Sequence, residues 1–352
     1  MRISSHDERR LSAALLRAYG MCEGDAETVA EAVTLSDMTG VYSHGLSRLT
    51  VYLRQLKCGA LNGTPDLRVL REYEAAVSYD CDNGSGVAAA DRVFDDVAGR
   101  AKKYGIAIGT GMHSANIGCG SYYALKGAKR DLITIMCCNT YLLMAPYGGV
   151  EPLLGTNPIV IGIPAGEERP VILDMATTLV AMGKVAYARR KNESIPDTWG
   201  KDENGAAVTD PNKVATLQPM AGYKGYGLAV MVDMLSAVLS GASFGREVGS
   251  LQRMEPENTG FCIIVIDPSK FMPIEEFKSR VDRYVRTMKD SRRAEGVEEI
   301  FMPGEIEQKQ YDVSAKDGVE IGEALVSELE ELAEKAGLAE KGERLQSIIE
   351  RI

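Results

Sequence analysis

The chain has 352 residues, of which 45% are hydrophobic and 26% are charged, and its formal net charge is −10 at pH 7. These proportions indicate a globular protein with a large buried core and room for two domains. The acidic balance argues against broad binding to nucleic acid or to an anionic membrane surface. One local basic site would still suffice for a small anionic ligand.

The seven cysteines are scattered and include no C-x-x-C pair. A chain with so large a core needs no disulfide framework, so we expect a reduced, cytoplasmic protein. The first residues, "MRISSHDERRL", are too polar for a signal peptide, and no apolar run approaches the ~18 residues of a membrane span. Three dispersed histidines without a cysteine cluster predict no metal site.

The N-terminal part of the chain has a helical pattern. The S-x-x-E sequence that begins at Ser5 predicts a capping box at the start of a helix, and Gly20 ends that helix. A second helix is expected over about residues 25–38, and a third helical segment reaches Gly59. Between the second and third lies the sequence "GVYSHGLSRL", residues 40–49.

This short sequence combines three reactive side chains. Arginine offers a planar fork suited to a substrate carboxylate, as Arg48 would here. Histidine ordinarily titrates near neutrality, so His44 could exchange a proton with a carbonyl or alcohol, and Ser43 could orient it or bind the substrate. A spacing of four places His44 and Arg48 on one face of any helical turn. The alternative is an ordinary helix start with a surface histidine.

The middle of the chain alternates between short apolar runs and helical segments. A helix is expected from Gly86 onward, and the last segment, 320–352, is charged and helical. Such alternation favours an α/β sheet with helices on its faces. The polar segment 200–211 is rich in turn residues. The predicted strands cover residues 75–80, 106–111, 132–138, 158–164, 170–176 and 261–267.

The sequence "GYKGYGLAVMVDMLSAVLSG", residues 222–241, is a second unusual stretch. Its glycines and Lys224 precede a long apolar helix, and a helix N-terminus of this kind suits a phosphate or carboxylate. The alternative is a tight loop that enters a core helix. A Rossmann fingerprint is absent, because Ser114 stands where the third glycine after Gly109 and Gly111 would be needed. Any dinucleotide site is therefore of another type.

Taken together, these stretches resemble the malate/L-lactate dehydrogenase family of the non-Rossmann type. That family also includes ureidoglycolate, sulfolactate and 2,3-diketo-L-gulonate oxidoreductases and cyclic-imine reductases. The matches keep their order and spacing over about three quarters of the chain. They are "SHGLSRL" (43–49), "NTYLLMAPYGG" (139–149), "LLGTNPIVIGIPAG" (153–166), "ILDMATTLVAMGKV" (172–185), "IPDTWGKDENGAAVTDP" (195–211), "GYKGYGLAVMVDMLSAVLSGASFG" (222–245) and "MPGE" (302–305).

The resemblance implies a non-Rossmann NAD(P)-binding α/β fold, with a mixed sheet, flanking helices and an active site between two domains. Residues 1–75 with 310–352 would form a helical, substrate-side and dimerisation domain, and residues 76–309 an α/β cofactor-binding domain. A homodimer or a dimer of dimers is implied. By the same resemblance Ser43, His44 and Arg48 would face the substrate. The cofactor would be bound by Asn139, Asp174, Met175, Ala176, Lys224, Gly225, Pro303, Gly304 and Glu305.

Two positions depart from the family pattern. Asn116 stands where the family usually carries a histidine that is commonly taken as the catalytic acid/base. An amide cannot shuttle a proton near neutral pH, although its NH₂ group can donate a hydrogen bond. His113 lies three residues away, and an odd offset in an extended segment points to the opposite face. Met182 stands where the family often has arginine, which weakens any anion contact there.

The sequence therefore predicts an NAD(P)-dependent oxidoreductase that moves a hydride between nicotinamide and C2 of a small 2-hydroxy or 2-keto carboxylic acid. His44 would carry the proton, Arg48 would bind the carboxylate and Asn116 would polarise the reacting oxygen or nitrogen. The cofactor is NAD or NADP, with NAD preferred. One alternative is a cyclic-imine reductase acting on pyrroline- or piperideine-2-carboxylate, or an enzyme for an unusual substrate. Another is a non-catalytic nucleotide-binding homologue.

Overall fold

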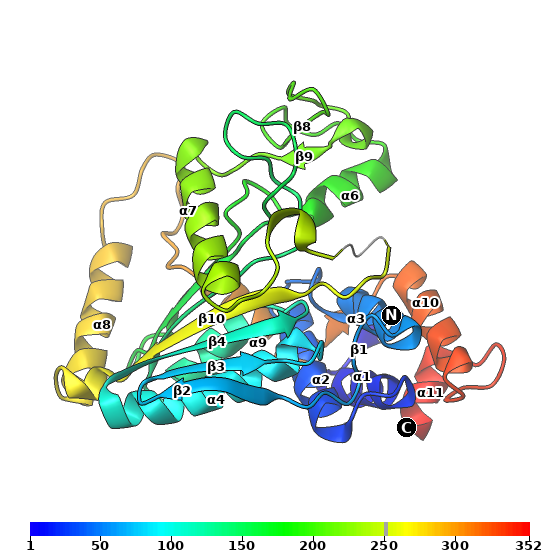
Figure 1. Ribbon diagram of the computed structural model, residues 1–352, viewed down its shortest axis with the longest axis horizontal. Coiled ribbons are helices and arrows are strands. Elements are labelled where there is room, and N and C mark those ends of the chain that lie inside the picture. Colours follow the sequence, from blue (N-terminus) through cyan, green and yellow to red (C-terminus); the bar gives the residue numbers. More distant parts are fainter. Residues whose placement is uncertain (250–252) are drawn as a thin grey trace.

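A mixed seven-stranded sheet lies at the centre of the computed structural model, which describes residues 1–249 and 253–352 (Figure 1). Its strand order is β2-β3-β4-β10-β5-β6-β7. Strands β3 and β4 are parallel and the other neighbours are antiparallel. The strands are β2 (Arg68–Tyr73), β3 (Ala76–Asp80), β4 (Ile106–Ser114), β5 (Ile133–Cys138), β6 (Ile159–Ile163), β7 (Val171–Met175) and β10 (Thr259–Ile266). The expected α/β fold with a mixed sheet is confirmed.

Six of these strands match the predicted apolar runs, and β2 does not. All residues of β2 are exposed, so its sequence "RVLREY" lacks the apolar pattern by which a half-buried strand is recognised. It forms the edge of the sheet through a hairpin with β3, and its charged side chains are typical of a protected edge. Strand β2 lies on the N-terminal side of the predicted domain boundary at 75/76, and that boundary stays a prediction.

Helices cover both faces of the sheet. Helix α4 (Gly86–Tyr104) packs with Val93 and Val97 on β4, where Gly109 leaves the necessary space, because a Cβ there would lie 2.4 Å from Val97. Helix α5 (Ser121–Ala128) lies on β5 and β6. On the opposite face, α7 (Tyr223–Asp233) continues into a π-helical turn, η2 (Met234–Val238), which packs on β10. The predicted long helix after Lys224 thus changes its winding in its second half.

The N-terminal and C-terminal helices gather beside one end of the sheet (Figure 1). A single apolar core runs from these helices into the α4 face of the sheet, and β1 (Arg2–Ile3) pairs with β11 (Val319–Glu320). The helices are α1 (Ser5–Ala18), α2 (Glu23–Met38), α3 (Leu46–Cys58), α10 (Glu323–Lys335) and α11 (Leu345–Arg351).

The predicted capping box at Ser5 is wrong by one residue. Ser4 is the N-cap of α1, and its Oγ accepts a hydrogen bond from the backbone N–H of Asp7 at 3.1 Å. Glu8, which the capping box would have turned back to the helix start, is instead fully buried. The Glu8 side chain is buried between α1 and α2, a position that the local sequence pattern could not indicate.

A smaller lobe stands above the sheet in Figure 1 and contains α6 (Met182–Lys191), β8 (Gly200–Lys201) and β9 (Thr216–Leu217). Its own apolar cluster includes Leu143 and Val185. Helices α8 (Ile274–Lys289) and α9 (Glu305–Asp317) lie between β10 and α10 in the chain. Within the described residues, no helix has the length and apolarity to cross a membrane, and no three potential metal ligands cluster.

Candidate active site

A cavity of about 390 Å³ lies between the N-terminal helices, the β5–β7 half of the sheet and the first residues of α6. Several segments that are far apart in the sequence meet there. They are residues 39–48, the loop after β4, the ends of β5–β7, the start of α6 and the turn before α9. Eight of the predicted site residues line it, namely Ser43, His44, Arg48, Asn116, Asp174, Ala176, Pro303 and Gly304.

The turn that carries Ser43 and His44 is fixed from behind by Asp37. Helix α3 begins at Leu46, and the Leu46 N–H donates to Asp37 Oδ2 at 2.7 Å. Gly45 makes this close approach possible, because a Cβ at this position would lie 1.8 Å from Asp37 Oδ1. Asp37 therefore caps α3 from nine residues upstream, and the turn is held in place just before the helix.

A second buried carboxyl group lies against Asp37. Glu8 of α1 is fully buried, and burial together with the nearby Asp37 raises its pKa to about 10. Burial also raises the pKa of Asp37 to about 6, although the hydrogen bond from Leu46 opposes this. Glu8 is thus neutral at pH 7 and does not place a second negative charge behind the turn.

His44 is held by its neighbour Ser43, whose Oγ lies 3.0 Å from His44 Nδ1. Burial and the positive charge of Arg48 lower the pKa of His44 to about 4. The imidazole is therefore neutral at pH 7, where the sequence predicted titration near neutrality. The difference arises from the enclosed position of the ring and from the guanidinium four residues away.

Arg48 lines the cavity from the first turn of α3. Its Nε is buried without a hydrogen-bond partner, and no ion pair joins its guanidinium to any residue in 1–249 or 253–352. Burial raises the pKa of Glu257, and the positive charge of Arg48 is one of the effects that oppose this rise. Arg48 is thus a buried donor that an anionic ligand could satisfy.

Asn116 is oriented by two donors. Its Oδ1 accepts hydrogen bonds from Tyr52 Oη at 2.8 Å and from the Gly118 N–H at 3.0 Å. These bonds define which end of the amide is the acceptor and leave the NH₂ group as a donor where the side chain lines the cavity. Asn116 therefore presents a positioned, uncharged donor.

His113 is placed elsewhere. Its Nδ1 lies 2.9 Å from Asp80 Oδ1, its backbone φ is +48°, and it does not line the cavity. This arrangement agrees with the odd offset from Asn116 in the sequence. His113 therefore lies outside the wall of the cavity that Asn116 lines.

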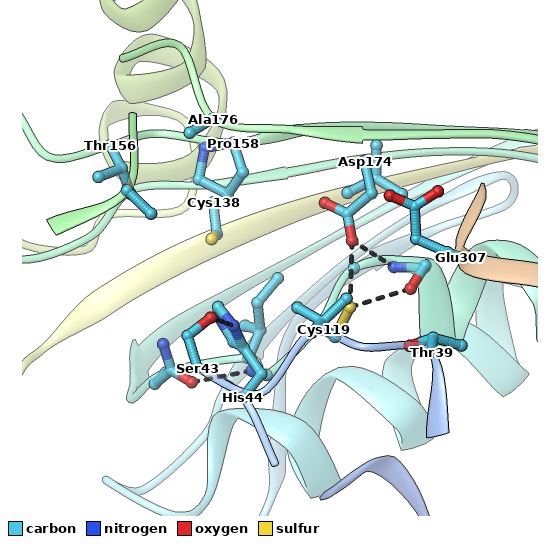
Figure 2. A pocket seen from close by; sticks show the side chains of 18 of the residues that line it. Thr39, Ser43, His44, Cys119, Cys138, Thr156, Pro158, Asp174, Ala176 and Glu307 are labelled. Atoms are coloured by element: carbon cyan, nitrogen blue, oxygen red, sulfur yellow. Dashed lines mark hydrogen bonds between the residues drawn. The ribbon is translucent and has the colours of Figure 1, made fainter. Parts of the chain in front are cut away.

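Two carboxylates lie on the other side of the cavity. Figure 2 shows Asp174 and Glu307 apart from Ser43 and His44, with Cys119 between the two groups. Asp174 Oδ2 accepts from the Ser121 N–H at 2.7 Å and from Cys119 Sγ at 3.3 Å, which ties β7 to the start of α5. Burial raises the pKa of Asp174. Four other residues of the cavity wall belong to no motif of the sequence and were not predicted, namely Thr39, Cys119, Ser121 and Glu307.

The other predicted cofactor residues lie outside the cavity wall. Asn139 is buried, and its amide bridges Gly260 N–H and Ser243 C=O at 2.8 and 2.9 Å. Glu305 pairs with Lys289 and Lys309. Lys224 is exposed at the start of α7. The cofactor-binding roles of these residues, and of Met175 and Gly225, stay predictions.

Comparisons with known proteins extend over almost the whole chain. Residues 3–330 match the family described as malate/L-lactate dehydrogenase. The chain is 36% identical to L-sulfolactate dehydrogenase of Methanocaldococcus jannaschii over 96% of its length and 98% of that protein. It is 34% identical to ureidoglycolate dehydrogenase (NAD(+)) of Escherichia coli strain K12 over 91% of its length and 93% of that protein.

The solved structures agree with these sequence comparisons. Sulfolactate dehydrogenase of M. jannaschii superposes with a TM-score of 0.89, covering 96% of this chain and 98% of that one. Delta1-piperideine-2-carboxylate reductase of Pseudomonas syringae pvar. tomato superposes with a TM-score of 0.86 at 28% identity, covering 95% of this chain and 100% of that one. The fold is therefore shared by proteins that are named for different reactions.

Proposed function

Because this chain belongs to the malate/L-lactate dehydrogenase family and is an oxidoreductase of that family, we propose that it transfers a hydride between NAD and C2 of a small 2-hydroxy or 2-oxo carboxylic acid. The observation that carries the proposal is the meeting of His44, Arg48 and Asn116 at one cavity. They come from a turn, from the helix after it and from the loop that follows β4. Each supplies a different requirement of the reaction.

Arg48 would hold the substrate carboxylate, because its guanidinium has no partner in the described chain and suits bidentate binding. Asn116 would donate a hydrogen bond to the reacting oxygen and polarise the carbonyl. His44 would exchange the proton of that oxygen. When His44 Nδ1–H donates to Ser43 Oγ, Nε2 keeps its lone pair and is the nitrogen available to the substrate.

The lowered pKa of His44 suits the direction of alcohol oxidation. In alcohol oxidation the neutral imidazole accepts the hydroxyl proton, and it is neutral at pH 7 because its pKa is about 4. In reduction the imidazolium must donate. Burial is the larger cause of the lowered His44 pKa and would persist with substrate bound, whereas a substrate carboxylate on Arg48 would offset the smaller cause, the Arg48 charge, and so ease protonation in the direction of reduction.

The opposite side of the cavity fits the nucleotide. Hydroxyl and carboxylate groups of Thr39, Ser121, Asp174 and Glu307 can bind ribose hydroxyls, and Pro303–Gly304 closes the wall. When bound, the nicotinamide supplies or accepts the hydride. Carboxylates near a ribose favour NAD, since they accept from a 2′-hydroxyl and repel a 2′-phosphate. We therefore expect Glu307→Lys to narrow the preference for NADH over NADPH by about tenfold, measured as the ratio of kcat/KM values, with Glu307→Gln as the uncharged control.

A cyclic-imine reductase is the second candidate, favoured by Asn116 and by the structural similarity to a reductase of that name. An imine of pyrroline- or piperideine-2-carboxylate also presents one carboxylate for Arg48, and its nitrogen would need a proton in place of the carbonyl oxygen. A non-catalytic role is the third candidate. The presence of Ser43, His44 and Arg48 in one cavity speaks against it, because a degenerate site tends to lose several such groups.

The test is turnover of a panel of 2-oxo acids and cyclic-imine carboxylates by the purified full-length protein, followed through NADH and NADPH absorbance. We expect turnover of 2-oxo acids with NADH. Turnover restricted to imines would replace the first candidate with the second. Nucleotide binding in calorimetry without turnover of any compound would favour the non-catalytic candidate, and no binding to either nucleotide at millimolar concentration would contradict all three.

The homodimer would form through the outer face of α7 and η2. This face carries a row of exposed apolar side chains at helical spacing, which an isolated monomer rarely presents in such number. They are Leu228, Met231, Met234, Leu235, Val238 and Leu239. A second copy would cover the row. Light scattering at micromolar concentration should give at least a dimer, and Leu235→Glu should shift it toward the monomer. A fully active wild-type monomer would contradict this assignment.

A further inference from the structure

We propose that the enzyme selects substrates with a single anionic group and rejects those that carry a second carboxylate or a sulfonate. The inference rests on the proposed function, since it concerns the substrate half of the same cavity. The structure assigns that half one cation, Arg48, and surrounds it with neutral and apolar side chains.

The wall of the cavity carries few charged side chains. Four ionisable side chains of the usual charged types line it, and they are His44, Arg48, Asp174 and Glu307. His44 is neutral at pH 7 as described above, and the two carboxylates are negative or neutral. Within residues 1–249 and 253–352, Arg48 is thus the single permanent cation of the cavity wall. One guanidinium satisfies one carboxylate, and no second side-chain cation is left for another anion.

The polar groups near Arg48 bear on the same preference. Glu257 is buried near Arg48 without an ion pair to a described residue, and burial raises its pKa against the opposing hydrogen bond from Gln55 and the Arg48 charge. Asn116 adds an uncharged donor, with its oxygen already occupied by Tyr52 and Gly118. A second anion placed here would face neutral donors and would lose its hydration without gaining an ion pair, which is costly in an enclosed site.

The start of α6 forms another part of the wall of the substrate half. A Cβ on Gly183 would lie 4.0 Å from Ser43 Cβ, so the start of α6 is adjacent to the turn. Met182 precedes Gly183 in the cavity wall, and with Tyr141 it packs against the apolar cluster that contains Leu143. The substituent on C3 of the substrate would therefore meet thioether, aromatic and aliphatic groups.

The N-terminus of α6 adds positive potential beside this wall, and Lys184 in its first turn is exposed and does not line the cavity. A helix end contributes the equivalent of about half an elementary charge, which solvent screens where the end is exposed. Ala181, the N-cap, is exposed and offers no side-chain donor. This partial charge is smaller than the full charge that a second carboxylate would require for compensation. The apolar wall thus governs the preference.

The experiment compares kcat/KM values with NADH for matched acids. Pyruvate, 2-oxobutyrate and pyrroline-2-carboxylate carry one carboxylate, and oxaloacetate and 3-sulfopyruvate carry a second anion. We expect the best singly anionic substrate to exceed both dianions by at least ~10²-fold, the order of discrimination that follows when a charged group has no partner in a site. Equal or higher kcat/KM for either dianion would overturn the inference.

Variants at Met182 test the cause. Met182→Arg should raise the ratio of kcat/KM for oxaloacetate over 2-oxobutyrate at least tenfold, whereas Met182→Leu, which keeps the apolar wall, should leave the ratio unchanged. Arg48→Met should lower kcat/KM for both classes by ~10²-fold or more. An unchanged ratio in Met182→Arg, with both variants folded as judged by their melting temperatures, would show that the wall does not set the preference.

A binding measurement separates this inference from the proposed function. Oxamate carries one carboxylate and tartronate carries two, and each can be titrated into the enzyme with NADH bound, with NADH fluorescence as the readout. Absence of turnover with every compound of the panel would contradict the proposed function. Tighter binding of oxamate than tartronate would then still support single-anion selectivity. Tighter or equal binding of tartronate, or no binding of either, would overturn it.

Discussion

The two sides of the cavity are built in different ways. On the His44 side, the turn, the imidazole and the Asn116 amide are each held by a neighbouring residue, whereas Arg48 has no partner among the described residues. Asp37 holds the turn, Ser43 holds the imidazole and Tyr52 holds Asn116. On the opposite side, Asp174 is tied to the start of α5, whereas Glu307 makes no hydrogen bond to a described residue. Chemistry requires fixed geometry, and nucleotide binding tolerates a looser arrangement.

This difference predicts how the two sides respond to substitution. Loss of a group on the His44 side should lower turnover without much change in nucleotide affinity. Loss of a carboxylate on the Asp174 side should change nucleotide affinity or selectivity with a smaller effect on turnover. Effects on kcat that separate from effects on nucleotide affinity in this way would support different roles for the two sides, and uniform effects on both sides would contradict them.

His44→Ala should have the largest effect. Removal of the proton carrier is expected to lower kcat by ~10²–10⁴-fold. The free-enzyme pKa of about 4 gives the sign of the pH profile. Oxidation needs neutral imidazole, so wild-type kcat/KM for the alcohol should rise as pH increases through about 4 and stay level above. This limb should be missing from the residual rate of His44→Ala.

The control for this prediction is His113→Ala, which should be mild because His113 pairs with Asp80 outside the cavity. If His113→Ala removed the pH limb and His44→Ala kept it, the assignment of the proton carrier would be wrong. Nucleotide affinity, measured by calorimetry, should be nearly the same in both variants.

Asn116→Ala should rank second. Loss of one positioned donor to the reacting oxygen is expected to cost ~10²–10³-fold in kcat, with the pH limb retained. Tyr52→Phe should cost less, on the order of tenfold, because Gly118 still holds the amide oxygen. If Asn116→His raised activity on simple 2-oxo acids, asparagine would mark a changed substrate class and the imine candidate would take precedence.

Asp37→Ala should have an intermediate effect that acts through the turn. It removes the cap of α3, which costs ~1 kcal/mol of stability for an exposed cap and more at this buried site. We expect kcat to fall about tenfold, with a smaller change in nucleotide affinity. Asp37→Asn keeps an acceptor for the Leu46 N–H and should recover most of the loss. Equal activity of Asp37→Ala and wild type would show that the turn needs no support from behind.

Glu8→Gln should have the smallest effect on turnover and a distinct effect on stability. The pKa of Glu8 rises from 4.5 to about 10 on folding, so the folded protein holds a proton that the unfolded chain releases. The wild-type free energy of unfolding should therefore fall as pH rises from about 5 to 9. Glutamine does not titrate, so the melting temperature of Glu8→Gln should fall less steeply over this range. Parallel melting curves against pH would refute the role of Glu8.

Much of the fold, and the turn that carries Ser43 and His44, could be predicted from the sequence. Apolar, β-branched runs predicted six strands of the sheet because their pattern is local. Helix spacing predicted that His44 and Arg48 would act together, and both line the cavity. The ordered motifs identified the family. Strand β2 was missed since an exposed edge strand has no apolar pattern, and the cap of α1 was predicted one residue too late, at Ser5 instead of Ser4.

Other features of the site depend on residues that are distant in the chain and are visible only in the tertiary structure. The hydrogen bond from Leu46 to Asp37 joins α3 to α2, and the burial of Glu8 follows from the packing of α1 against α2. The lowered pKa of His44 follows from its enclosure, which no spacing reveals. Asn139 and Glu305, whose cofactor-binding roles stay predictions, have partners within the protein that no sequence pattern indicates. Sequence patterns report local periodicity, whereas burial, charge and partners are set by the segments that the fold brings together.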